Sequence, residues 1–123
     1  MARVLVVDDD PAIRGTVKRA LVAHGYEVVE ASDGSQALEL FRAHPADLVL
    51  TDLYMPGVDG LEFTRRLAKE FAGARVVAMS GGVLQTPADA LEVAAMLGAA
   101  ATLPKPFSLD ELLDVVRKVL AGD

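Results

Sequence analysis

The sequence predicts an α/β fold in which a five-stranded, doubly wound parallel sheet is covered by five helices. Short apolar runs alternate with helix-start signals five times along the chain. Most of these runs are continuously apolar, which is typical of parallel strands that are buried on both faces. The connecting segments are only a few residues long, as expected for right-handed crossovers. With 123 residues, the chain is expected to form one domain over residues 1–123.

Five apolar runs, rich in Val, Leu and Ala, mark the expected strands. In chain order they are Val4–Val7, Val28–Val29, Leu48–Leu50, Val76–Met79 and Ala99–Leu103. The segment around the second run, Tyr26–Glu30, is the most polar of the five. Because an edge strand is less enclosed than a central one, this segment is expected at an edge of the sheet.

Each run is followed by a helix start. An Asp, Thr or Ser can cap each helix, and either Pro follows it or Gln or Glu stands three residues later. The starts are Asp10–Pro11, Asp33–Gln36, Asp59–Glu62, Thr86–Pro87 and Ser108–Glu111. In the last helix the expected apolar face consists of Leu109, Leu112, Leu113, Val116 and Leu120. This helical period predicts an amphipathic helix that packs on the sheet.

Composition and charge exclude several classes of protein. The chain is 52% hydrophobic and 24% charged, which is ordinary globular usage. It has no cysteine, so disulfide frameworks and thiolate metal sites are excluded. The net charge of −6 and the scattered basic residues argue against binding to nucleic acid or to a membrane surface. We expect a cytoplasmic protein, because the N-terminal apolar run is too short for a signal peptide or a membrane span. The short tail after the last expected helix predicts no attached output domain.

Polar side chains follow four of the five expected strands at their carboxyl ends. These segments are Asp8–Asp10, Thr51–Asp52, Ser80–Gly82 and Pro104–Pro106. Ligands of doubly wound sheets bind beyond these strand ends, so the side chains are expected to meet. Carboxylates, a hydroxyl and an ammonium around one point indicate phosphoryl transfer. A carboxylate can attack phosphorus, while the other groups stabilise the charge on the phosphoryl oxygens.

The converging carboxylates also predict a metal ion. Two carboxylates at 4 Å repel each other by about 1 kcal/mol in water, and by more when they are partly desolvated. A small, open site with only oxygen ligands favours Mg²⁺. We therefore expect Mg²⁺, or Mn²⁺ in its place, at the carboxyl ends of the strands.

Three further features have ordinary structural interpretations. Asp10 precedes Pro11 and is expected to act only as a helix cap. His24 and His44 fall at expected helix C-termini, where an imidazolium interacts favourably with the helix dipole. Gly81–Gly82 lacks the remaining glycines of a nucleotide-binding loop.

Together these motifs resemble the receiver domain of response regulators in two-component signalling. The matching segments occur in the family's order along the whole chain: Val6–Asp10, Asp52–Gly60, Ser80, Gly98–Ala99 and Lys105–Phe107. The resemblance implies the flavodoxin-like strand order 2-1-3-4-5. It also implies partners, namely a histidine kinase or phosphotransfer protein and a downstream protein target that the sequence does not identify.

The resemblance assigns the phosphoryl chemistry to three residues. Asp52 would be the phosphoacceptor, Lys105 would pair with the phosphoryl group, and Ser80 would hydrogen-bond to it. The switch would involve Ser80 and Thr102, and the Lys105–Pro106 peptide bond would be cis.

The resemblance also assigns the metal ligands. Mg²⁺ would be held by Asp9, by Asp52, by the backbone carbonyl of Tyr54 and, through water, by Asp8.

Three features depart from the family's pattern. Thr102 stands where the family usually has an aromatic residue, which requires a different readout or a small response. The stretch from Ser80 to Lys105 is a few residues longer than usual. Pro104 cannot donate a ladder hydrogen bond, so the fifth strand is expected to end there or to lie at an edge.

In the preferred hypothesis, phosphorylation shifts a two-state equilibrium and changes a protein-binding face formed by the fourth helix, fifth strand and fifth helix. The protein would catalyse its own phosphoryl transfer and dephosphorylation, and it would not be a turnover enzyme.

Three alternatives stay open at this point. One is an adaptor that signals by binding alone, and another is a flavodoxin-like cofactor binder, which the carboxylates after the first strand disfavour. The third is an aspartate-nucleophile phosphatase, in which a second Asp would replace Tyr54.

Overall fold

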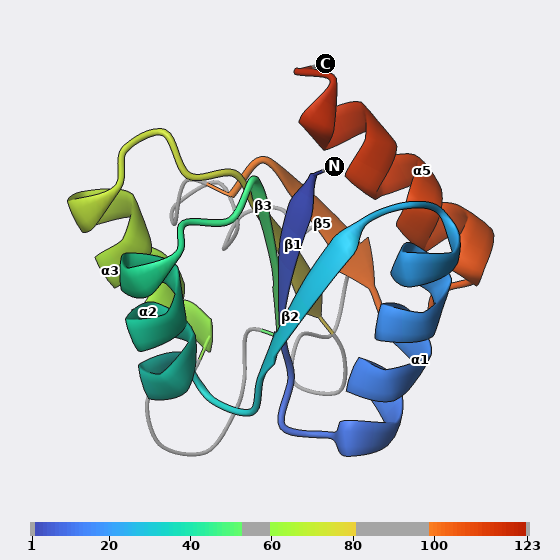
Figure 1. The fold of residues 1–123 in the computed structure, drawn as a ribbon, viewed down its shortest axis with the longest axis horizontal. Coiled ribbons are helices and arrows are strands. Elements are labelled where there is room, and N and C mark those ends of the chain that lie inside the picture. The colour runs from blue at the N-terminus through green and yellow to red at the C-terminus, as the bar shows by residue number, and fades with distance from the viewer. Residues whose placement is uncertain (1, 53–59, 81–98, 123) are drawn as a thin grey trace.

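A computed structural model describes residues 2–52, 60–80 and 99–122 of the chain. Five parallel strands form one sheet in the order β2-β1-β3-β4-β5 (Figure 1). The strands are β1 (Arg3–Val7), β2 (Glu27–Ala31), β3 (Leu48–Asp52), β4 (Val76–Ser80) and β5 (Ala101–Pro104). The helices in the described ranges are α1 (Pro11–Ala23), α2 (Gly34–Ala43), α3 (Gly60–Glu70) and α5 (Leu109–Leu120). The predicted fold class and strand order are confirmed. The expected helix that starts at Thr86–Pro87 lies outside the described residues.

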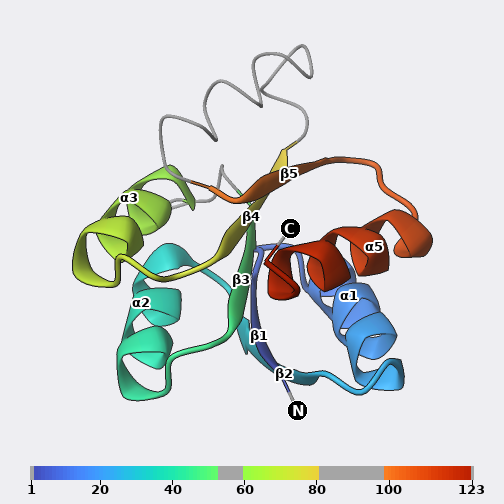
Figure 2. The same cartoon turned by 90° about the horizontal axis from the view of Figure 1, so that it is seen from above.

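The helices cover the sheet in two layers. Figure 2 shows α1 and α5 on one face, and α2 and α3 on the other. Side chains of β1 alternate between these faces, because successive residues of a strand point in opposite directions. Val4 and Val6 belong to the cluster beneath α1 and α5, whereas Leu5 and Val7 belong to the cluster beneath α2 and α3. A strand with a core on each face must be apolar at every position, which explains the continuous run.

The two edge positions agree with the sequence. β2 lies at one end of the sheet and has more accessible residues than β1, which confirms the assignment of Tyr26–Glu30 to an edge strand. β5 forms the other edge and ends at Pro104. The missing N–H of Pro104 therefore interrupts no central ladder.

Side-chain caps start the helices where the sequence predicts them. The carboxylate of Asp10 accepts a hydrogen bond from the backbone N–H of Ala12 at 2.9 Å, directly before Pro11. Asp33 likewise caps α2. Ser108 accepts from the N–H of Glu111 at 3.0 Å, and the Glu111 carboxylate accepts from the N–H of Ser108 at 3.4 Å. These contacts satisfy N–H groups that have no partner within the helix. The expected cap Asp59 lies outside the described residues.

The apolar face of α5 differs in part from the expected one. Leu112 and Val116 are fully buried, but Leu109 is 45% exposed. Val119 is buried instead, which the expected face did not include. Leu109 is the first residue of the helix. At this position the helix has only begun to lie over the sheet, so the periodicity overestimated its burial.

Gly25 closes α1 with a left-handed turn. Its φ is +89°, a conformation that residues with a Cβ rarely adopt. The N–H of Gly25 donates to the carbonyl of Val22, and the N–H of Tyr26 donates to the carbonyl of Leu21. This pair of bonds is the Schellman motif, which satisfies the last helical carbonyls and directs the chain into β2.

Candidate functional site

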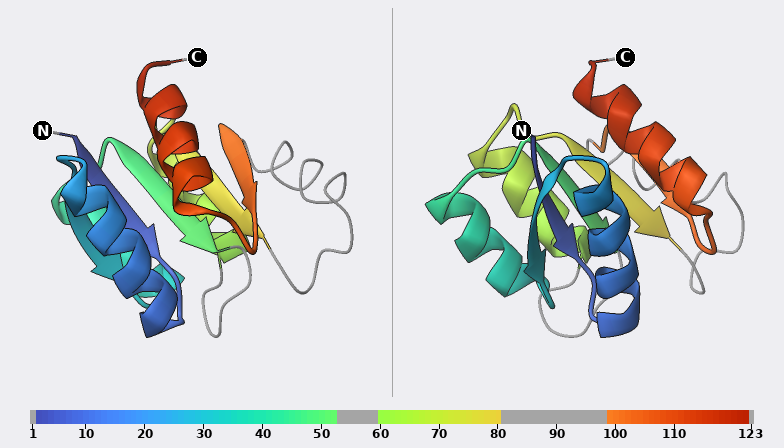
Figure 3. Two further views of the ribbon diagram at one scale, coloured as in Figure 1. Left: turned by 90° about the vertical axis from the view of Figure 1, so that its right-hand side faces the viewer. Right: turned by 45° about the vertical axis from the view of Figure 1, so that its right-hand side comes forward.

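The register of the sheet brings two acidic residues to the same edge. Val7, the last residue of β1, is paired with Thr51 of β3. Asp8 therefore follows the end of β1 at the level where Asp52 ends the neighbouring strand β3. All five strands run in the same direction (Figure 3). The connection from β1 to α1 and the end of β3 therefore lie at the same edge of the sheet. This is the edge at which the sequence predicts a site.

Three carboxylates meet at this edge. One oxygen from each of Asp8, Asp9 and Asp52 lies within 4.8 Å of the other two. Asp8 is buried, Asp52 is half-buried and Asp9 is exposed, so the group is open on one side. An open set of oxygen-only ligands fits a hard cation such as Mg²⁺, which usually keeps several waters. The residues present thus suit the expected metal.

Lys105 lies between two of these carboxylates. Its Nζ donates to Oδ2 of Asp8 at 2.8 Å and to Oδ2 of Asp52 at 3.1 Å. The side chain of Asp8 is 1% exposed and that of Asp52 is 13% exposed, so water screens these contacts little. Burial lowers the pKa of Lys105, but the hydrogen bonds and negative charges of Asp8 and Asp52 outweigh burial and raise the pKa above its ordinary value of 10.5.

The buried carboxylate of Asp8 has partners for both oxygens. Oδ2 accepts from Lys105, and Oδ1 accepts from the backbone N–H of Asp10 at 2.9 Å. The backbone N–H of Asp8 donates to the carbonyl of Ala31 on β2 at 3.2 Å. A buried charge without partners would destabilise the fold. These bonds fix the Asp8 carboxylate beside the strand ends.

The other predicted site residues are described only in part. Ser80 is the last residue of β4 and pairs in register with Pro104, which places its backbone beside the segment that leads to Lys105. The side chain of Ser80, and the whole of Tyr54 and Gly81–Gly82, lie outside the described residues. Thr102 is half-buried in β5, in register with Ala78 of β4.

The Lys105–Pro106 peptide bond is cis, the geometry that the resemblance implies. Asp10 caps α1. His24 and His44 are the C-cap residues of α1 and α2, in agreement with their expected structural positions.

Arg14 contacts the site although the sequence analysis did not single it out. Its Nη1 donates to the backbone carbonyl of Asp8 at 2.7 Å. The spacing contains a signal, since Arg14 follows the helix cap Asp10 by four residues, about one helical turn. A long side chain at that spacing can reach back to the turn that precedes the helix.

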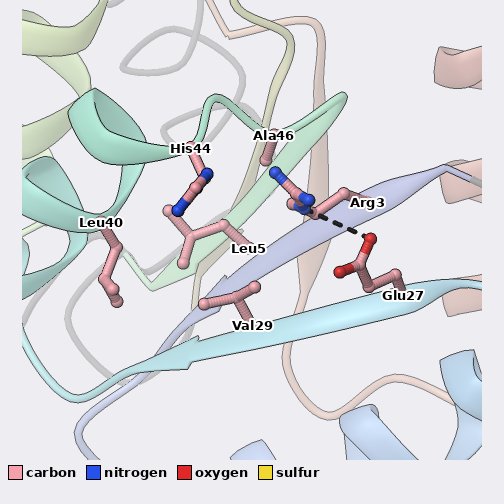
Figure 4. Close-up of a pocket in the computed structure, with 7 residues that line it drawn as sticks. All are labelled: Arg3, Leu5, Glu27, Val29, Leu40, His44 and Ala46. Atoms are coloured by element: carbon pink, nitrogen blue, oxygen red, sulfur yellow. Dashed lines mark hydrogen bonds and ion pairs between the residues drawn. The ribbon is translucent and has the colours of Figure 1, made fainter.

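Among the hollows lined by described residues, two lie at opposite ends of the sheet. One of about 510 Å³ lies beside Lys105 and is lined by Ile13, Val17, Pro106 and Phe107 among others. The other encloses about 250 Å³ at the amino ends of β1 and β2, where Arg3 pairs with Glu27 near His44 (Figure 4). Of these two, the first adjoins the carboxylate group through Lys105, and most of the side chains that line it are apolar.

No helix in the described part of the chain is long and apolar enough to cross a membrane.

Comparison with known sequences gives a consistent result. The family model for the response regulator receiver domain matches residues 4–117. Chemotaxis protein CheY of Bacillus subtilis is 37% identical over 120 residues, which cover 96% of this chain and 97% of that protein. Sporulation initiation phosphotransferase F of the same organism is 35% identical, with 96% and 93% covered. Response regulator MprA of Mycolicibacterium vanbaalenii is 41% identical, but this chain spans only 50% of its length.

Solved structures agree with the sequence matches. A CheY-like receiver domain protein from Methanospirillum hungatei superposes with a TM-score of 0.90 at 27% identity, covering 99% of this chain and 95% of that one. Chemotaxis protein CheY4 of Vibrio cholerae superposes with a TM-score of 0.87 at 30% identity, covering 97% and 98%.

Proposed function

Because this chain belongs to the response regulator receiver domain family, we propose that Asp52 accepts a phosphoryl group from a phosphohistidine. The donor is a histidine kinase or a phosphotransfer protein, and the transfer depends on Mg²⁺. Phosphorylation then changes the protein–protein contacts of the chain in the cytoplasm. The protein is itself the phosphoryl acceptor and does not turn over an external substrate.

One observation carries this proposal. The carboxylates of Asp8, Asp9 and Asp52 have oxygens within 4.8 Å of one another, and Lys105 hydrogen-bonds to both Asp8 and Asp52. A nucleophilic carboxylate, an oxygen-ligand metal site and a fixed ammonium are the components that phosphoryl transfer to a carboxylate requires. The carboxylates that follow β1 disfavour a flavin-binding site. An aspartate-nucleophile phosphatase would have a second Asp two residues after Asp52, where this chain has Tyr54.

The chemical step is a displacement at phosphorus. A carboxylate oxygen of Asp52 forms a bond to phosphorus while the bond from phosphorus to the donor's imidazole nitrogen breaks. The electron pair of that bond stays on the imidazole, and the product on Asp52 is an acyl phosphate. The Nζ of Lys105, at 3.1 Å from Oδ2 of Asp52, is close enough to donate to an oxygen of the transferred group. Its positive charge stabilises the charge that the transition state spreads over those oxygens.

Asp8, Asp9 and Asp52 would hold Mg²⁺, together with the carbonyl of Tyr54 by family resemblance. When bound, the ion would neutralise charge on the carboxylates and on the phosphoryl oxygens. Asp8 contributes from a rigid position, because its carboxylate and its backbone N–H are both hydrogen-bonded. Asp9 contributes from the open side of the site.

Intact-mass analysis tests the proposal. The protein is incubated with a small acyl phosphate, with Mg²⁺ or with EDTA, beside the variants Asp52→Asn and Asp33→Asn. The wild type and Asp33→Asn are expected to gain one phosphoryl group with Mg²⁺ only, since Asp33 caps α2 and Asn caps a helix as well as Asp does. Asp52→Asn is expected to gain none.

Equal incorporation by Asp52→Asn would overturn the assignment of the acceptor. No incorporation by any variant, also with a histidine-phosphorylated donor protein, would instead support an adaptor that signals by binding alone.

A further inference from the structure

We propose that Arg14 is a positioning residue that holds the acidic turn Asp8–Asp10 in the shape that binds Mg²⁺. The inference rests on the magnesium site of the proposed function, and adds a residue that contacts neither the metal nor the phosphoryl group. Arg14 lies in the first turn of α1, directly after this acidic turn.

The contact is a hydrogen bond from a charged group to the backbone. Nη1 of Arg14 donates to the carbonyl oxygen of Asp8 at 2.7 Å. The Arg14 side chain is 19% exposed, so water competes little for this bond. Bonds with an ionised donor are shorter and stronger than neutral ones. The guanidinium thus fixes the Asp8 carbonyl from the side of α1.

The backbone of Asp8 is thereby held by hydrogen bonds at both its N–H and its carbonyl. Its N–H donates to Ala31 at the end of β2, while its carbonyl accepts from Arg14. The carbonyl belongs to the planar peptide group that joins Asp8 to Asp9. Fixing that plane also fixes the direction in which the Cα of Asp9 leaves it.

Asp9 depends on this restraint more than the other two acids do. Its side chain is exposed and, within the ranges that the structure describes, no hydrogen bond or ion pair of its own holds it. Asp8 and Asp52 are both bonded to Lys105. The position of the Asp9 carboxylate is therefore set by the backbone of the turn.

The positive charge of Arg14 is balanced by the carboxylate of Glu30 on β2. Oε1 of Glu30 lies 3.6 Å from Nε of Arg14, and Lys18 reaches the other oxygen of Glu30 at 3.4 Å. Nε of Arg14 is buried and makes no hydrogen bond within the described residues, so its relation to Glu30 is ionic. Without Glu30, the guanidinium would repel a cation bound at the neighbouring carboxylates.

A positioning role and a purely electrostatic role of Arg14 predict opposite effects of replacing Arg14 on Mg²⁺ binding. If Arg14 acts only through its charge, Arg14→Met tightens Mg²⁺ binding and Arg14→Lys leaves it unchanged. If Arg14 positions the turn, Arg14→Met weakens binding although a positive charge is gone. Arg14→Lys then falls between Met and the wild type, because Lys lacks the planar fork that spans Asp8 and Glu30.

The test is the dissociation constant for Mg²⁺, measured by calorimetric titration of the whole protein. We expect a rise of about tenfold for Arg14→Met, the lower end of the effect of residues that orient metal ligands. Arg19→Met is the matched control, because Arg19 is exposed on the same helix and donates a hydrogen bond to Thr16. This control is expected to bind Mg²⁺ as the wild type does. An unchanged or tighter constant for Arg14→Met would overturn the inference.

A second readout separates positioning from loss of folding. The Mg²⁺ concentration for half-maximal phosphorylation should rise in Arg14→Lys, while the rate at saturating Mg²⁺ is retained. A loss of the saturating rate with an unchanged Mg²⁺ requirement would contradict a positioning role. If Arg14→Met does not fold, as judged by circular dichroism, Arg14→Lys decides the question. A wild type that binds no Mg²⁺ would instead refute the magnesium part of the proposed function, which is a different result.

Discussion

The Nζ of Lys105 lies 2.8 Å from Oδ2 of Asp8, although the two residues are 97 positions apart in the chain. They come from strands that are not neighbours, since β1 and β5 are separated by β3 and β4. Lys105 spans this distance by reaching from the edge of the sheet toward its centre, where it also bonds to Asp52. The ammonium would thus compete with a metal ion for two of the three expected carboxylate ligands.

Replacing Lys105 by Met should therefore change metal binding and phosphorylation in opposite directions. Mg²⁺ should bind more tightly, because no ammonium occupies Oδ2 of Asp8 and Asp52. The phosphorylation rate should fall by about 100-fold, since a fixed charge that stabilises the transition state is lost. Calorimetry and the intact-mass time course measure the two effects.

Lys118→Met is the control for the change in net charge. Lys118 is exposed on α5, pairs with Asp114, and should affect neither quantity. Weaker Mg²⁺ binding in Lys105→Met would contradict the proposed competition.

The ion pairs of Lys105 should make folding stability depend on pH in the alkaline range. The pKa of Lys105 is raised in the folded protein above its ordinary value of 10.5. The folded state then holds a proton that the unfolded state has lost, so stability falls as pH rises from about 10.5 through the raised pKa. Below pH 10 this contribution is fully present.

Urea unfolding of the wild type and of Lys105→Met measures this effect in metal-free buffer. The difference in unfolding free energy between the two proteins should shrink as the pH rises above the ordinary lysine pKa of 10.5. A constant difference over this range would show that the pairing of Lys105 with Asp8 and Asp52 is not coupled to its proton.

Shortening a buried side chain of the central strand, β3, should destabilise the fold. Leu50 is fully buried in β3, beneath α1 and α5. Leu50→Ala should lower the unfolding free energy by about 2–5 kcal/mol, because it removes apolar contacts and leaves a cavity. Val22→Ala is the comparison, since Val22 is 52% exposed on α1 and should change stability by about 0.5 kcal/mol or less. Chemical denaturation gives both values, and similar losses would place Leu50 outside the core.

The left-handed turn after α1 should require glycine. Gly25→Ala should cost about 1 kcal/mol, because the φ of +89° is unfavourable for a residue with a Cβ. No atom lies within 4 Å of the added Cβ at Gly25, so the cost is conformational rather than steric. Gly73 has equal space but no positive φ, so Gly73→Ala should be tolerated. Thermal unfolding of both variants checks this difference.

Much of the fold follows from local signals in the sequence. Asp10, Asp33 and Ser108 start helices because each side chain accepts a backbone N–H within three residues. Continuous apolar runs mark strands because each such strand has a core on both faces. These signals involve residues close together in the chain, so pattern and spacing were sufficient to predict them.

Other features depend on packing at a distance. The exposure of Leu109 reflects where α5 begins relative to the sheet, which a helical period does not contain. The contact of Arg14 with the Asp8 carbonyl depends on the path of the chain between β1 and α1. Its spacing from Asp10 permits the contact, but the folded chain brings the side chain to its two partners, the carbonyl of Asp8 and the carboxylate of Glu30.

Local pattern in the sequence was enough to predict which residue types stand at the strand ends, and therefore the class of chemistry. A carboxylate after β1, another at the end of β3 and a lysine after β5 follow directly from the order of apolar runs and polar residues. The pairing of Val7 with Thr51 and the reach of Lys105 to both Asp8 and Asp52 depend instead on the folded sheet. Register and side-chain reach depend on the twist and packing of the whole sheet, and such long-range contacts leave no periodic signal in the chain.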